Sequence, residues 1–276
     1  MTRVVGLLAW LALGAVALEA QGVMVAPHAV YIDHRTRSGS VLLYNPGTEP
    51  VEVSISTIFG YPTTDSAGAI RLDTLTADSS VSALRWIQAF PRRLTVMPRE
   101  RQTVRLLARP PAGLADGEYW LRLVIAAQAG RVPITGISDT TAIQIGLTLQ
   151  VRTIIGVNYR KGPVATGLTL SNLRAEVLHD SLITRSRLER RGNAAFVGMM
   201  RATLVDSSGV ARLSFNSPLG VYTVLEPRIG APLAASGVPR GRYWLRYEVV
   251  AEREDLDPAV VLKAPAVRDS VQLVVP

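Results

Sequence analysis

The sequence IQIGLTLQVRTIIGVNY, residues 143–159, is the stretch that decides the fold of this 276-residue chain. Its apolar side chains fall on every second position, with one interruption at Thr153 and Ile154. Such alternation is typical of a β-strand with one apolar face. Residues 143–157 would span roughly 50 Å, whereas common strands span about 17–20 Å. We therefore predict that this strand either bends between two sheets or offers an apolar edge to another molecule.

The N-terminal residues predict export from the cytoplasm. Arg3 is followed by an apolar run from Val4 to Leu18, and small residues follow in Ala20-Gln21-Gly22. This is the pattern of a secretory signal peptide, so we expect residues 1–22 to be removed. The alternative is a membrane anchor, but the run is shorter than the about 20 residues of a spanning helix. We expect no integral membrane segment after cleavage.

The composition excludes several classes of function. The chain has no cysteine, which rules out thiol nucleophiles and thiolate metal sites and leaves its stability to ordinary apolar cores. Its net charge is +8, but the basic residues are scattered along the chain. No basic stripe with interleaved aromatic residues is present, so we expect no nucleic-acid partner.

A six-residue pattern occurs twice. GEYWLR at residues 117–122 returns as GRYWLR at residues 241–246, each copy following a polar turn. A tyrosine that enters a late strand after such a turn is typical of the tyrosine corner of immunoglobulin-like sandwiches. We therefore predict that the hydroxyls of Tyr119 and Tyr243 each bond to backbone in the preceding turn. The repeat favours two similar domains, with a chance match of six residues as the alternative.

Taken along the chain, the pattern predicts an all-β fold with two immunoglobulin-like β-sandwich domains in tandem after the cleaved signal peptide. The first domain would cover residues 23–160 and include the long strand 143–157. The hinge would lie at residues 160–163, and the second domain would cover residues 164–276. Residues 61–68 are interpreted as a turn-rich segment of the first domain.

The chemistry of an enzyme is missing. No nucleophile elbow, phosphate loop, zinc-protease motif or dinucleotide fingerprint occurs in the sequence. His179, Asp180 and Ser181 are the residue types of a catalytic triad, but chain neighbours point apart. The acidic run at residues 252–257 lacks the spacing of a calcium loop and is more simply a solvated loop, with calcium as the alternative. We predict a protein that is not an enzyme and that has no cofactor and no metal site.

Three segments together resemble the PapD-like periplasmic chaperones that assemble pili. The segments are VMVAP through SVLLYNPG (residues 23–47), WIQAFPRRLTVMP followed by QTVRL (residues 86–106), and the alternating strand that ends in Tyr159-Arg160. The resemblance covers most of the first domain. In the second domain it rests mainly on architecture.

The resemblance implies donor-strand complementation in the periplasm. The long strand would fill the open groove of a pilin-like subunit, and an outer-membrane usher is a further candidate partner. The groove-filling side chains implied by this alignment are Ile143, Ile145, Leu147, Leu149 and Val151. The alternative interpretation is an exported structural or adhesive protein whose long strand only joins its two domains.

The resemblance also implies an anchor for the subunit's C-terminal carboxylate, made by two basic residues in the family. In this chain those positions are Ala29 and Gly156, and neither is basic. Arg152, Arg160 and His28 are the nearest basic candidates for that role.

Overall fold

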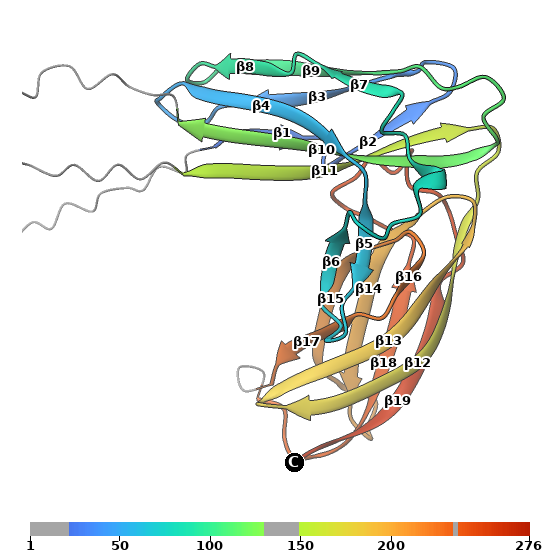
Figure 1. Ribbon diagram of the computed structural model, residues 1–276. Coiled ribbons are helices and arrows are strands. Elements are labelled where there is room, and N and C mark those ends of the chain that lie inside the picture. The colour runs from blue at the N-terminus through green and yellow to red at the C-terminus, as the bar shows by residue number, and fades with distance from the viewer. Residues whose placement is uncertain (1–21, 130–148, 234–236) are drawn as a thin grey trace, which may run out of the picture.

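The computed structural model describes residues 22–129, 149–233 and 237–276. These residues form β-strands and one short 3-10 helix, η1 (Ser79–Val81). The strands make two sandwiches, the first lying across the top of Figure 1 and the second below its right-hand end. The predicted all-β, two-sandwich fold is confirmed. Within the described ranges, no helix is long and apolar enough to cross a membrane.

The first sandwich has two sheets of four and five strands. In order across the sheet, the first consists of β1 (Met24–Ala26), β3 (Ser38–Tyr44), β9 (Arg101–Ala108) and β7 (Ile87–Phe90). The second consists of β2 (Ala29–Asp33), β11 (Gln150–Lys161), β10 (Gly117–Ala129), β4 (Val51–Ile58) and β8 (Arg93–Val96). The chain changes from one sheet to the other between β1 and β2.

The second sandwich also has two sheets. One contains β12 (Thr166–Leu178), β13 (Ser181–Gly192) and β16 (Val224–Leu225), with β17 (Arg228–Pro232) also paired to β13. The other runs β15 (Ala211–Val221), β14 (Phe196–Val205), β18 (Gly241–Val250) and β19 (Val267–Val275). The connection from β11 to β12 turns at Gly162, whose positive φ of 62° suits a residue without Cβ.

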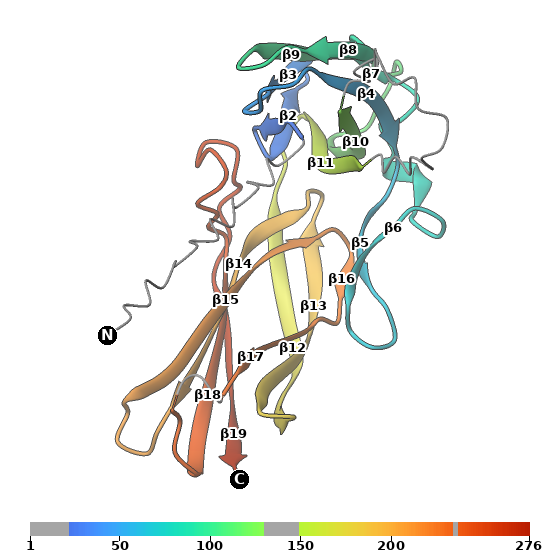
Figure 2. The same ribbon diagram turned by 90° about the vertical axis from the view of Figure 1, so that its left-hand side faces the viewer.

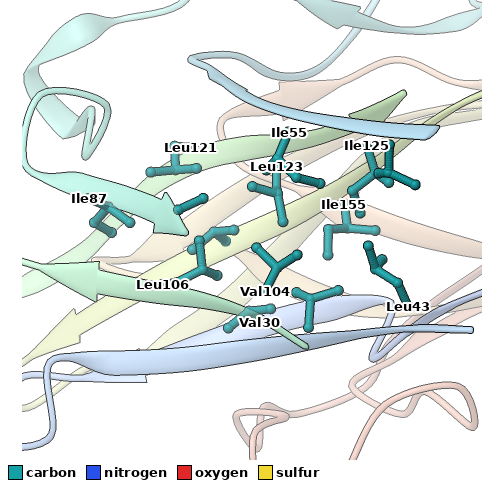
Figure 3. Close-up of a cluster of buried hydrophobic side chains, with 14 of the residues drawn as sticks. Val30, Leu43, Ile55, Ile87, Val104, Leu106, Leu121, Leu123, Ile125 and Ile155 are labelled. Atoms are coloured by element: carbon teal, nitrogen blue, oxygen red, sulfur yellow. The ribbon is translucent and has the colours of Figure 1, made fainter. Parts of the chain in front are cut away.

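The core of the first sandwich follows from period-two alternation. Every second side chain of β9 and β10 points inward, so Val104, Leu106, Leu121, Leu123 and Ile125 have no exposed area. Figure 3 shows these side chains converging between the two sheets. Burial of each such side chain contributes about 1.5–3 kcal/mol to the stability of the fold. Because a slip of one residue would turn these side chains toward solvent, their burial fixes the register of the strands.

Both predicted tyrosine corners are confirmed. The Tyr119 hydroxyl donates to the Ala115 carbonyl at 3.0 Å, and the Tyr243 hydroxyl donates to the Pro239 carbonyl at 2.7 Å. Each bond ties the turn before a strand to the start of that strand. The repeated motif therefore has the same local structure in both sandwiches, in β10 and in β18.

The segment interpreted as turn-rich is a β-hairpin that reaches the second sandwich. It consists of β5 (Tyr61–Thr64) and β6 (Ile70–Asp73), and Figure 2 shows it beside β16. The Glu226 amide donates to the Thr64 hydroxyl at 3.0 Å, and the Arg228 amide donates to the Gly68 carbonyl at 2.8 Å. Its short strands contain a proline and threonines, so no apolar alternation marked them in the sequence.

Candidate functional site: a free strand edge beside the domain joint

One edge of β11 is only partly covered. β10 pairs with β11 along its whole length, from Gly117 opposite Lys161 to Gln128 opposite Gln150. On its other edge β11 pairs with β2, in parallel, only from Gly156 to Arg160. Among the described residues, the stretch Gln150–Ile155 therefore has a free edge, on which alternate residues present unpaired N–H and C=O groups. We call residues 149–155 the donor edge; β11 is the lowest strand of the first sandwich in Figure 1.

The apolar row of β11 passes from the surface into the core. Leu149 and Val151 are 56% and 39% exposed, whereas Ile155 and Val157, on the same strand face as Val151, are 4% and 0% exposed. The first sandwich therefore uses only the C-terminal half of this row for its own core. The predicted strand is confirmed from Gln150 onward. The predicted groove-filling residues Ile143, Ile145 and Leu147 lie outside the described residues.

The interruption of the sequence pattern at Thr153 and Ile154 is not a bulge. The pairing of β10 with β11 continues through both residues without a shift, and Ile154 stands opposite Val124. Ile154 lies on the other face of the strand and is 47% exposed. The donor edge consequently carries exposed apolar side chains on both faces, a feature that the period-two pattern alone did not single out.

The three basic candidates for a carboxylate anchor do not meet. Arg152 is exposed, and its Nε donates to the Gln150 side chain at 2.8 Å. His28 is also exposed, with its Nδ1 3.7 Å from a carboxylate oxygen of Asp255. Arg160 lies eight residues beyond Arg152 on the same strand, which corresponds to about 26 Å.

Arg160 is held by the joint between the two sandwiches. Its Nε donates to Glu118 at 2.7 Å and its Nη1 donates to the Val260 carbonyl of the second domain at 2.7 Å. The guanidinium also lies over the Tyr31 ring, 4.3 Å from the centroid. Burial raises the pKa of the Tyr31 phenol, which keeps that ring neutral beneath the cation. These contacts stabilise the relative position of the two domains.

The centre of the joint is aromatic. Trp120 is 1% exposed and meets Tyr222 of the second domain edge to face, with ring centroids 4.8 Å apart. Tyr61 stacks on the same Tyr222 ring at 5.9 Å. The indole Nε1 of Trp120 donates to Glu118 at 2.7 Å, and the same carboxylate oxygen accepts the Ala195 amide at 3.1 Å. The first copy of the repeated motif therefore docks directly onto the second domain.

Arg122 is the residue of this site that sequence reasoning missed. It is 7% exposed; its Nε donates to the Gly60 carbonyl at 2.9 Å and its Nη1 donates to the Tyr222 hydroxyl at 3.1 Å. Its Nη2 is buried without a hydrogen-bond partner, and within the described ranges Arg122 forms no ion pair. A buried cation that lacks a carboxylate is costly, which makes Arg122 a candidate for contact with an anion.

The register of the sheet brings the Arg122 side chain beside Gly156. In the sheet, Gly156 pairs with Arg122 on one side and with Ala29 on the other. A Cβ at Gly156 would lie 2.8 Å from Arg122 Nη1, so the glycine leaves the space that the guanidinium occupies. No motif signals this arrangement, because it depends on the register between two strands that are distant in sequence.

Comparison with known proteins gives matches among solved structures only. No family model matches the chain, and no curated protein matches it. A crystal structure of the YadV chaperone is 14% identical with a TM-score of 0.45, covering 91% of this chain and 99% of that chain. The Pseudomonas aeruginosa CupB2 chaperone is 12% identical with a TM-score of 0.44, covering 92% and 100%. The complex of the Salmonella enterica SafA pilin with the SafB chaperone gives 11% identity and a TM-score of 0.45. This match covers 92% of this chain and 99% of that chain.

Proposed function

We propose that this chain is a non-enzymatic periplasmic chaperone that holds a pilin-like subunit by donor-strand complementation. The observation that carries the proposal is the donor edge. There, β11 has free main-chain groups, and its apolar row continues to Leu149 and Val151 after the chain's own core has ended. An added strand would gain affinity from main-chain hydrogen bonds and specificity from the alternate side chains.

The described side chains account for part of the binding free energy. Full burial of a leucine or valine contributes about 1.5–3 kcal/mol, so covering the exposed portions of Leu149 and Val151 would contribute about 2 kcal/mol together. Ile143, Ile145 and Leu147 extend the same row in the sequence and are proposed to fill further pockets of the subunit. An outer-membrane usher is proposed as the partner that receives the loaded chaperone.

We place the carboxylate anchor at Arg122 rather than at Arg152, Arg160 or His28. Arg122 has a donor without a partner and lies opposite Gly156, next to the end of the donor edge. A subunit whose last strand pairs with β11 would bring its terminal carboxylate to this end of the edge. The charge-assisted bond would fix the register of the added strand and compensate the buried guanidinium.

Site-specific photo-crosslinking in the periplasm of the source organism tests the proposal. A benzophenone amino acid at Leu149 should capture one small secreted protein whose sequence predicts an incomplete immunoglobulin-like sandwich. The matched control places the same group at Leu178, a leucine with 40% exposure at the end of β12. Capture of the same product from both positions, or of nothing but a second copy of the chain, would contradict the chaperone function. The second outcome would favour a structural protein.

A further inference from the structure

The two copies of the repeated motif present equivalent outward faces, and only the first copy is covered. In β10 the outward side chains are Glu118, Trp120 and Arg122, which are 2%, 1% and 7% exposed beneath the second domain. In β18 the equivalent side chains are Arg242, Trp244 and Arg246. All three are exposed, and 46% of the Trp244 surface is open to solvent. We call these three residues the β18 face.

The contacts of the first copy show what covers such a face. Trp120 is met by an aromatic ring from the second domain, Tyr222, and Arg122 lies over the same ring with 4.6 Å between the guanidinium carbon and the centroid. The indole Nε1 of Trp120 donates to a carboxylate, which Glu118 supplies from the same strand. An aromatic ring from the other domain therefore covers this face, and the face supplies its own acidic oxygen through Glu118.

The second copy has the opposite charge at one of these positions. Arg242 stands where Glu118 stands in the first copy, and an arginine side chain only donates hydrogen bonds. In the part of the chain that the structure describes, neither Arg242 nor Arg246 forms an ion pair. The nearest arginines of the same sheet face differ, since Arg268 is paired with Glu248 and Arg201 with Glu252.

The side chains directly beside Trp244 and Arg246 on the adjacent strands are uncharged. Trp244 stands between Val205 of β14 and Gln272 of β19, and Arg246 stands between Thr203 and Ser270. None of these flanking side chains is acidic. A hollow beside Trp244 is lined by Ser207, Arg242, Gln272 and Val274.

We propose that the β18 face binds an acidic segment of a partner protein, with an aromatic side chain packed on Trp244 between two carboxylates. Arg242 and Arg246 are four residues apart on one strand, so their Cα atoms lie about 13 Å apart. An extended segment that carries carboxylates at positions i and i+4 and an aromatic residue at i+2 matches this spacing. A second copy of this chain is a poor occupant, because two such basic faces repel each other. The surface is separate from the donor edge and does not depend on it.

Fluorescence anisotropy with a labelled peptide tests the proposal. The probe is a twelve-residue peptide made of Glu-Thr-Tyr-Thr repeats, and a peptide with glutamine in place of glutamate is its neutral control. Arg242→Gln combined with Arg246→Gln should weaken binding about fivefold, and Trp244→Ala should weaken it to a similar extent. Because the peptide covers an exposed indole, it should also reduce acrylamide quenching of wild-type tryptophan fluorescence but not that of Trp244→Phe.

The matched control separates this face from the general basic charge of the protein. Arg101 and Arg105 lie on β9 with the same four-residue spacing, both exposed and with Arg101 near the Tyr44 ring, but without an exposed tryptophan. Arg101→Gln combined with Arg105→Gln should change peptide binding less than about twofold. Equal losses in the two double variants would overturn the proposal in favour of unspecific attraction. Tighter binding of polygalacturonate than of the peptide would overturn it in favour of an acidic glycan.

Discussion

Two single variants of β11, Val151→Thr and Val157→Thr, test whether Val151 serves a partner or the core of the sandwich. Val151 and Val157 lie on the same face of the strand, but 39% of Val151 is exposed and none of Val157 is. In Val157→Thr the new hydroxyl is buried without a partner, so the free energy of unfolding should fall by about 1–3 kcal/mol. In Val151→Thr water can solvate the hydroxyl, and the change should stay within about 0.5 kcal/mol.

The effects of the two variants on binding of the client, which is the proposed pilin-like subunit, should be reversed. Covering the exposed part of Val151 contributes about 1 kcal/mol, so Val151→Thr should weaken client binding about fivefold while the protein remains folded. Urea unfolding measures the stability of both variants, and the yield of client co-purified from the periplasm measures binding. If Val151→Thr destabilised the isolated protein as much as Val157→Thr does, Val151 would be an ordinary core residue and the donor edge would have no support.

Three further substitutions test other contacts of the structure. Tyr243→Phe removes the bond to the Pro239 carbonyl and should lower the free energy of unfolding by about 1 kcal/mol in urea; an unchanged midpoint would show that this corner adds no stability. Gly156→Ala should displace the Arg122 guanidinium and lower stability by about 1 kcal/mol, and a more stable alanine variant would contradict the tight contact. Asp206→Asn tests a pH dependence: bonds from Ser208, the Val210 amide and Arg212 hold the pKa of Asp206 well below its usual range. The ionised Asp206 carboxylate should therefore contribute fully to the free energy of unfolding at neutral pH. This stabilisation should be lost progressively as the pH falls below about 4, so the melting curves of variant and wild type should converge in acid.

The sequence was sufficient where one local rule decides the structure. Alternation predicted β11 because period two has one physical cause, a strand with one apolar face. The tyrosine corners were predictable for a similar reason, since the hydroxyl of Tyr119 needs only a carbonyl four residues before it. Both signals lie within one short stretch of chain, so no knowledge of distant partners was required.

The site depended on pairings that no local pattern encodes. Arg122 becomes a candidate anchor only because its strand pairs with β11 at Gly156, and because Tyr222 of another domain closes over it. The hairpin that carries Thr64 was likewise hidden, since its short strands show no apolar alternation and its contact with Glu226 joins residues that are distant in sequence. Charge alone indicated Arg152, Arg160 and His28, yet Arg160 is engaged by Glu118 and Val260.

The position at which β2 joins β11 determines which part of β11 serves the core and which part is free for the proposed partner. From Gly156 onward β11 has strands on both sides, and its apolar row is buried there. Before Gly156 it has β10 alone, and Val151 on the same row is exposed. A longer β2 would cover the donor edge and abolish the site, whereas a shorter one would expose Val157 and weaken the core. The length of β2 thus sets where the paired part of β11 ends and where the proposed binding of a partner strand would begin.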